Sequence, residues 1–160
     1  MKNCKAGAVV IAALCVAGPV RAFDQLVFRV DGGGDLEDDL RSASLVVAAQ
    51  SEDVTDPAEL LAAARADYGR LVGSLYSEGR YGGVISILVD GREAADISPL
   101  ARLGRIGTIT VDVQPGPVYD FSQADIGPLA PETEIPDEYA VGQPARSGII
   151  SDAAGVSIDA

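Results

Sequence analysis

The segment Thr108-Ile-Thr-Val-Asp-Val-Gln114 alternates apolar and polar residues over its whole length. In an extended chain, successive side chains point to opposite sides. The apolar side of this segment consists of Ile109, Val111 and Val113. Pro115-Gly-Pro117 follows directly, and such a sequence ends a strand because proline has no amide hydrogen and glycine favours turns. The segment therefore predicts a β-strand with one buried face.

A second strand is predicted near the start of the same region. Gln25–Val30 alternates in the same way and is followed by the turn-forming sequence Asp31-Gly-Gly-Gly34. Its apolar side consists of Leu26, Phe28 and Val30.

The third predicted strand covers Val84–Asp90, with Ile85, Ile87 and Val89 on one side. The stretch between this strand and Thr108 contains several residues that interrupt regular structure, namely Gly91, Pro99 and Gly104. We therefore expect Asp90–Arg105 to be a loop.

Two helices are predicted between the first two strands. In the first, Asp35 precedes a stripe of apolar residues at helical spacing and is expected to be the N-cap, with Asp38 three positions later. The stripe consists of Leu36, Leu40, Ala43 and Val47.

The start of the second helix is marked by Asp56-Pro57-Ala58-Glu59, which places an N-cap, a proline and an acidic residue in the preferred order. Its apolar face runs to Glu78, and Gly79 stands where a C-terminal cap is expected. The face consists of Leu61, Ala64, Tyr68, Leu71 or Val72, and Leu75.

Gly69 and Gly73 lie four residues apart within the second helix. The charged residues Asp67 and Arg70 interrupt this segment, which argues against a membrane dimerisation motif. We instead expect the glycines to allow close approach of another element, and we therefore expect Gly69→Ala to destabilise the domain.

The order of elements is β-α-α-β-β, which predicts an α+β fold with two helices covering one face of a three-stranded sheet. After Pro117 the pattern starts again, with a strand expected over Val118–Ile126, a proline-rich loop, and the beginning of a helix over Ala145–Ala160. These last 43 residues are too few to form a core alone. We expect residues 23–117 to form one domain and residues 118–160 to be the incomplete start of a second repeat.

The composition of residues 23–160 excludes many functions. They contain no Cys, His, Lys, Trp, Met or Asn. Cysteine proteases, Ser-His-Asp triads, His/Cys metal sites and Schiff-base chemistry are therefore excluded. Nine arginines against 24 acidic residues give a formal charge of −15, which repels phosphate backbones and argues against a nucleic-acid partner.

Residues 1–22 have the composition of an export signal. Two lysines precede the apolar stretch Ala6–Gly18, and Val20-Arg21-Ala22 offers small residues at the positions that a signal peptidase recognises. The apolar stretch is shorter than the roughly 20 residues that span a bilayer. We expect a mature chain that begins near Phe23 outside the cytoplasm. An uncleaved anchor is the alternative, whereas bulky Leu14 argues against lipid modification of Cys15.

Two stretches are similar to a known family. Leu75-Tyr-Ser-Glu-Gly-Arg-Tyr-Gly-Gly-Val-Ile-Ser-Ile87 joins a helix end, a G-x-Y sequence and the start of a strand. Ile109-Thr-Val-Asp-Val-Gln-Pro-Gly-Pro-Val-Tyr119 joins a strand to a V-x-x-G-P-x-Y junction. With the β-α-α-β-β order, they resemble POTRA domains, which are polypeptide-transport-associated modules on the periplasmic side of outer-membrane assembly barrels. The resemblance covers nearly all of residues 23–160.

The resemblance implies a non-catalytic periplasmic module that docks other polypeptides by pairing them with an edge strand. In the family the second strand is an edge, and the corresponding residues here are Val84, Ile85, Ser86, Ile87, Leu88, Val89 and Asp90. The expected partners are proteins, namely a periplasmic or inner-membrane partner subunit and unfolded outer-membrane protein clients. No cofactor, metal, nucleic acid or small-molecule substrate is expected.

The family also has a C-terminal β-barrel, which would need many more alternating segments and aromatic residues than the five Tyr and three Phe found here. Contact with the outer membrane is therefore expected only through a barrel outside this sequence. The chain would then be a fragment of a longer protein or a truncated gene product.

The main alternative is a free-standing acidic secreted protein that binds Ca²⁺ or a basic partner. Asp31–Asp39 holds the clustered carboxylates that Ca²⁺ prefers, but it lacks the spacing of an EF-hand loop. A hydrolase that uses only carboxylates is the one enzyme class that the composition permits. Because the acidic residues fall at helix starts and in loops, no enzyme is expected.

Overall fold

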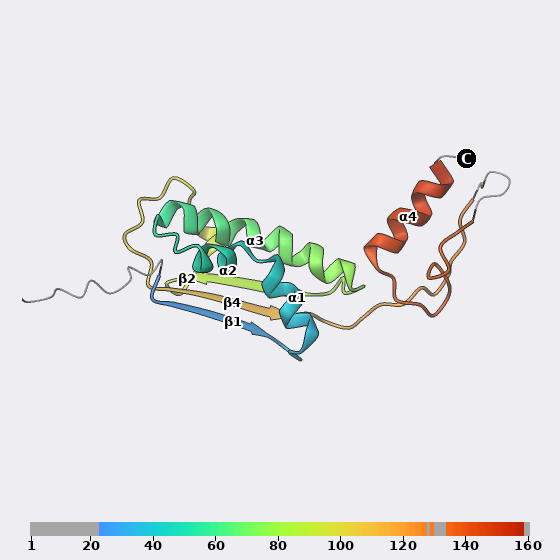
Figure 1. Cartoon of the computed structure of the whole chain (residues 1–160), viewed down its shortest axis with the longest axis horizontal. Coiled ribbons are helices and arrows are strands. Elements are labelled where there is room, and N and C mark those ends of the chain that lie inside the picture. The colour runs from blue at the N-terminus through green and yellow to red at the C-terminus, as the bar shows by residue number, and fades with distance from the viewer. Residues whose placement is uncertain (1–22, 128, 130–133, 159–160) are drawn as a thin grey trace, which may run out of the picture.

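The computed structural model describes residues 23–127, 129 and 134–158 (Figure 1). The predicted export signal lies outside these residues. The elements, in chain order, are β1 (Gln25–Val30), α1 (Asp35–Ala43), α2 (Leu45–Ser51), α3 (Pro57–Ser77), β2 (Val84–Val89), β3 (Arg92–Glu93), the 3₁₀ helix η1 (Ala94–Asp96), β4 (Thr108–Gln114) and α4 (Ser147–Ile158).

The sheet has the strand order β1-β4-β2-β3. β1 is parallel to β4 and places Gln25 opposite Thr108, whereas β2 is antiparallel to β4 and places Val84 opposite Gln114. The α+β class is confirmed, but the predicted sheet of three strands has a fourth, two-residue strand. The central position of β4 leaves β1 on one border of the sheet and the β2–β3 pair on the other.

The additional strand arises from a tight hairpin within the stretch that was expected to be a loop. Asp90 and Gly91 have φ values of 48° and 79°, and two successive positive φ angles match the right-handed twist of a two-residue hairpin. β3 therefore folds back on the end of β2 and places Glu93 opposite Leu88.

The first predicted helix is divided into α1 and α2. Ser44 has an extended conformation, and its side chain accepts a hydrogen bond from the Val47 amide at the start of α2. Ser44 also donates to the carboxylate of Asp67, which lies on α3 and is fully buried. The prediction of one continuous stripe was wrong because the break depends on this partner 23 residues away. The N-cap of α1 is Gly34 rather than Asp35, which is the first helical residue.

Both ends of α3 agree with the sequence prediction. The side chain of Asp56 accepts a hydrogen bond from the Ala58 amide, and Pro57 is the first helical residue. At the other end, the Gly79 amide donates to Tyr76 and the Arg80 amide donates to Leu75, with φ of 73° at Gly79. This pair of bonds is a Schellman motif, in which glycine avoids the strain of a positive φ.

The core lies between the helices and one face of the sheet (Figure 1). The residues that β4 contributes are fully buried and form the predicted apolar face, namely Ile109, Val111 and Val113. The largest side chains that the helices contribute are Leu40, Leu60, Leu71 and Leu75. Burying such a leucine stabilises a fold by about 1.5–3 kcal/mol relative to its exposure.

The two glycines of α3 do not make the expected contacts. A Cβ atom at Gly69 or Gly73 would have no atom of another element within 4 Å. Both residues are exposed, so the prediction of close packing was wrong.

After Gly116 the chain runs along the C-terminal end of α3 and continues to α4 (Figure 1). The Tyr119 amide donates to the Gly79 carbonyl oxygen (2.9 Å), and the Ala145 amide donates to that of Tyr119 (2.8 Å). The expected helix is present as α4, but the strand over Val118–Ile126 was wrong because only Asp120 forms an isolated bridge there. In the part of the chain that the structure describes, no helix is long and apolar enough to cross a membrane.

Candidate functional site

β2 contains six of the seven residues predicted to form a docking edge. Asp90, the seventh, lies in the turn to β3. Its carboxylate accepts hydrogen bonds from the amides of Gly107 (2.9 Å) and Thr108 (2.8 Å). Asp90 therefore ties the turn to the start of β4 and is directed away from the outer border.

Alternate residues of β2 direct their backbone groups away from β4. The Asp90 amide donates to the Thr108 carbonyl oxygen (2.8 Å). In the antiparallel register, the even-numbered residues of β2 therefore form their backbone hydrogen bonds with β4. The backbone N–H and C=O groups of Ile85, Ile87 and Val89 therefore point towards the outer border.

Two of these three positions are covered. β3 pairs with β2 at Leu88 and Val89. At Ile87, the amide donates to Glu93 Oε1 at 2.9 Å. The outer border of β2 is thus closed from Ile87 to the end of the strand.

Glu93 is held in place by hydroxyl groups from two other elements. Ser86 Oγ on β2 donates to Glu93 Oε2 (2.8 Å), and the Tyr68 hydroxyl on α3 donates to Glu93 Oε1. The same hydroxyl oxygen lies 3.3 Å from the carbonyl oxygen of Ile87. The side chain of Tyr68 therefore lies next to the backbone of Ile87 at the sheet edge, where the Glu93 carboxylate is bound.

The pKa values of this pair reflect its geometry. Burial, together with the hydrogen bond to Glu93, raises the pKa of Tyr68 to about 12. Burial alone would raise the pKa of Glu93, but the hydrogen bonds from Tyr68, Ile87 and Ser86 outweigh it and lower that pKa. The stable form is therefore a Glu93 carboxylate bound to a protonated Tyr68.

The open part of the β2 border is short. Of the outward-facing backbone groups, those of Ile85 have no hydrogen-bond partner among the described residues. The adjacent Val84 side chain is 60 % exposed. An incoming strand would find a free backbone on β2 only over Val84–Ser86.

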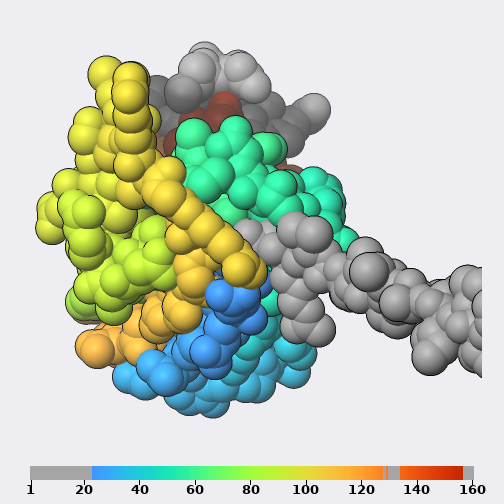
Figure 2. Space-filling model, turned by 90° about the vertical axis from the view of Figure 1, so that its left-hand side faces the viewer, coloured from blue at the N-terminus to red at the C-terminus, as the bar shows by residue number. Residues whose placement is uncertain are grey.

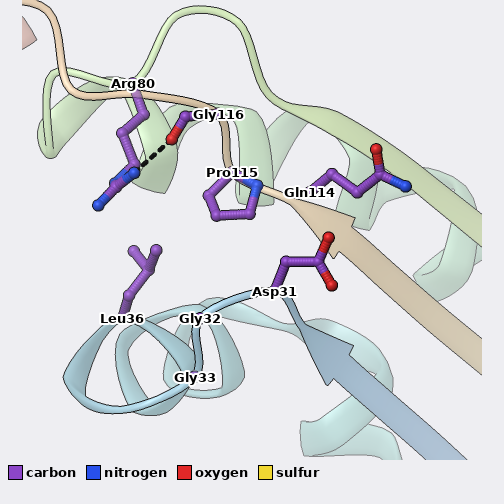
Figure 3. Close-up of a pocket in the computed structure, with 8 residues that line it drawn as sticks. All are labelled: Asp31, Gly32, Gly33, Leu36, Arg80, Gln114, Pro115 and Gly116. Carbon is purple, nitrogen blue, oxygen red and sulfur yellow. Dashed lines mark hydrogen bonds between the residues drawn. The ribbon is translucent and has the colours of Figure 1, made fainter.

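A cavity of about 570 Å³ lies where β1 and β4 end. Its lining residues are Asp31, Gly32, Gly33, Leu36, Arg80, Gln114, Pro115 and Gly116. Figure 3 shows the side chains of Arg80 and Leu36 entering this space from opposite sides. The Arg80 guanidinium donates to the Gly116 carbonyl oxygen and so joins the end of α3 to the end of β4.

Within the described ranges, no group of three or more His, Cys, Asp or Glu residues is placed to hold a metal ion. Asp67, the buried carboxylate, accepts hydrogen bonds from Ser44, Leu45 and Val46. These bonds begin α2, which assigns Asp67 a structural role.

No family model matches the chain, and a search of curated proteins found no match either.

The two residues that close the β2 border were not predicted from the sequence. Tyr68 was assigned to the apolar face of its helix, and Glu93 to a loop. The dipeptide Asp90-Gly91 between Val89 and Arg92 is a strong hairpin signal and would have predicted β3. The contact between Glu93 and Tyr68 joins residues 25 positions apart, and no local pattern in the sequence predicts it.

Proposed function

We propose that this chain is a non-catalytic module of the POTRA type, which binds extended segments of other polypeptides by adding them to its sheet. The observation that supports the proposal is the mixed sheet with helices on one face and the strands β1 and β2 on either side of β4. Such a sheet has a border on which unpaired backbone groups can receive another strand.

Within this class, we propose a module like the N-terminal region of TamA, the outer-membrane subunit of the translocation and assembly module, which the sequence pattern resembles. The module would act as a periplasmic arm that docks a partner subunit or unfolded outer-membrane proteins. The export signal proposed for residues 1–22 agrees with this location. Cleavage after Ala22 on expression in a Gram-negative host, measured by the mass of the periplasmic product, tests the location separately.

Binding by strand addition has a specific requirement for backbone amides. A short fluorescent peptide of alternating apolar and polar residues should bind the full chain with saturable anisotropy. The matched control is the same peptide with every backbone amide methylated, which keeps every side chain but removes, on both of its edges, the hydrogens that a sheet border accepts. We expect the methylated peptide to bind at least about tenfold more weakly, or 1.4 kcal/mol. Equal binding of both peptides, or binding of neither, would contradict the proposed function.

A further inference from the structure

The border of β1 carries outward-facing backbone groups along its whole length. The amides of Gln25 and Asp31 donate to Gly107 and Val113 on the β4 side. In the parallel register, the odd-numbered residues of β1 therefore bond to β4, and the even-numbered ones point away. The outward amides belong to Leu26, Phe28 and Val30, and none of them has a hydrogen-bond partner among the described residues.

The two borders differ in how firmly they are covered. At β1, Arg41 of α1 donates to the Phe28 carbonyl oxygen at 3.3 Å, which is long for a hydrogen bond. At the end of the strand, the Gly33 amide donates to the Val30 carbonyl oxygen at 3.1 Å, which leaves the Val30 amide free. The Arg41 side chain is 39 % exposed and is also bonded to Glu37, and its guanidinium lies 4.8 Å from the centre of the Phe28 ring. Because neither of these contacts uses the Phe28 carbonyl oxygen, Arg41 keeps both partners if an incoming strand takes that oxygen. At β2, a hydrogen bond of 2.9 Å and a two-residue strand cover the border.

The charges around β1 indicate what kind of segment fits this border. Between residues 24 and 41 there are six acidic residues and two arginines, and all the acidic residues except Glu37 are exposed. Figure 2 shows β1 and α1 together on one side of the molecule, in the two blue shades of the colour scale. A basic segment would be attracted there, and an acidic one would be repelled.

We propose that the border of β1, rather than that of β2, receives the partner, and that the partner is an extended basic segment with alternating apolar residues from another polypeptide. The segment pairs with Leu26, Phe28 and Val30 as a fifth strand. Its apolar residues can cover the half-buried Val27 on the open face of the sheet, and its basic residues lie among the carboxylates of residues 24–39. This assignment rests on the proposed function and names the surface and the partner chemistry that the function requires.

Residue-resolved amide exchange of the full chain distinguishes the two borders. The probe is a short peptide of alternating valine and lysine, and its matched control replaces each lysine with glutamate. We expect the lysine peptide to slow exchange at the amides of Leu26, Phe28 and Val30 by about tenfold or more, and to leave Ile85 unchanged. We also expect the glutamate peptide to bind more weakly, and the affinity of the lysine peptide to fall as salt is added.

Two proline variants provide a second measurement. Proline is tolerated on an edge strand where the lost amide faces outward, so Leu26→Pro and Ile85→Pro each remove one outward amide from a different border. We expect Leu26→Pro to weaken binding of the lysine peptide by about tenfold and Ile85→Pro to leave it unchanged. Melting curves of both variants show whether each is folded, and the exchange experiment on the unmodified chain does not depend on them.

The outcomes separate this inference from the proposed function. Slowed exchange at Ile85 instead of the β1 amides would overturn the inference and leave strand addition standing. No peptide binding at all would overturn both. A third outcome concerns self-association. If exchange at the β1 amides slows when the protein concentration is raised without peptide, and sedimentation velocity detects a dimer, a second copy occupies the border. That result would overturn the proposed partner.

Discussion

The carboxylate of Glu93 accepts a hydrogen bond from the backbone amide of Ile87, with Oε1 and N 2.9 Å apart. A side chain from one strand thus occupies a backbone position that another polypeptide would use. Natural sheets limit unwanted edge pairing by covering their borders with charged side chains and short strands. Here the covered border is that of β2, which the resemblance suggested for docking. The border of β1 is therefore the better candidate for docking.

Replacing Glu93 should expose the β2 border. In Glu93→Ala, we expect exchange of the Ile87 amide to become faster and the free energy of unfolding to fall by about 1–2 kcal/mol, because a charged acceptor of hydrogen bonds is lost. Amide exchange and chemical denaturation measure the two effects. The neighbouring Arg92→Ala serves as the control, since Arg92 also lies in β3. An Ile87 amide that exchanges equally fast in both variants and the parent would contradict the role of Glu93.

The pair formed by Tyr68 and Glu93 predicts a pH dependence with a definite sign. The pKa of Tyr68 is raised to about 12, above its usual value of about 10. Its contribution to stability is therefore complete below about pH 10 and is lost as the pH rises through about 12. The pKa of Glu93 is lowered, so its contribution is complete above its usual pKa of about 4.3 and is lost as the pH falls through the lowered value.

Absorbance of the phenolate form, followed against pH, measures the titration of Tyr68. We expect the titration of the folded protein to include one tyrosine with a pKa near 12, and we expect Tyr68→Phe to remove that step. Tyr81 also has a raised pKa because of burial, and Tyr81→Phe is the control that should retain the step near 12. A high-pH step that persists in Tyr68→Phe would contradict the assignment.

The buried carboxylate of Asp67 should be among the most sensitive positions for stability. It accepts hydrogen bonds from Ser44 Oγ (2.5 Å), from the Leu45 amide (2.7 Å) and from the Val46 amide (3.1 Å). In Asp67→Ala, these buried donors lose a charged acceptor, and we expect a loss of about 3–5 kcal/mol in the free energy of unfolding.

Chemical denaturation of Asp67→Ala, Ser44→Ala and the double variant tests whether the two residues act together. Because they share a hydrogen bond, we expect the double variant to lose less than the sum of the two single losses. Strict additivity would show that Asp67 does not act through the start of α2.

The sequence predicted the elements whose signals are local. The alternation in Gln25–Val30 and Thr108–Gln114 gave both strands with their observed bounds, because one face of each packs on the core. The division of the first helix at Ser44 was missed because a stripe of apolar residues continues through it, and the residue that stabilises the break lies on another helix. The strand expected over Val118–Ile126 failed for a related reason. A strand requires a partner, and alternation in one segment does not supply it.

The candidate site was harder to predict than the fold. The position of β2 followed from its alternation, but whether its border is open depends on Glu93 and Tyr68, which approach each other only in the folded chain. The same is true of Arg41, which reaches Phe28 from α1. The chemistry of a sheet border is therefore determined by side chains from elements outside the strand itself.

Gly69→Ala should stabilise the protein, opposite to the expectation from sequence. Gly69 lies in the middle of α3, is exposed, and has no atom of another element within 4 Å of the position where a Cβ would lie. Alanine should then raise the free energy of unfolding by about 0.5–1 kcal/mol, because it restricts the unfolded chain and favours the helix. Thermal denaturation measures the change.

Gly83→Ala is the contrasting variant, because a Cβ at Gly83 would lie 2.5 Å from Leu75 Cδ1, a side chain that is 1 % exposed. We expect this substitution to lower the melting temperature, since Leu75 has to move within a packed core. A lower melting temperature in Gly69→Ala as well would contradict this prediction and would support a packing role for Gly69.

Calcium should leave the stability of the protein unchanged. The acidic residues of Asp31–Asp39 are the strongest argument for a calcium-binding protein, yet the described residues include no group of three carboxylates placed around a common point. Asp35, Asp38 and Asp39 are all exposed, so water weakens the repulsion among them. Asp35 and Asp38 also lie in the first turn of α1, where negative charge is favourable.

An ion present at a concentration of 100 times its Kd would add about 2.7 kcal/mol to the free energy of unfolding. Melting curves with excess CaCl₂, and with MgCl₂ as the control for ionic strength, measure this difference. A large rise specific to calcium would favour the alternative of a free-standing calcium-binding protein, and its loss in Asp31→Asn would place the ion beside the end of β1.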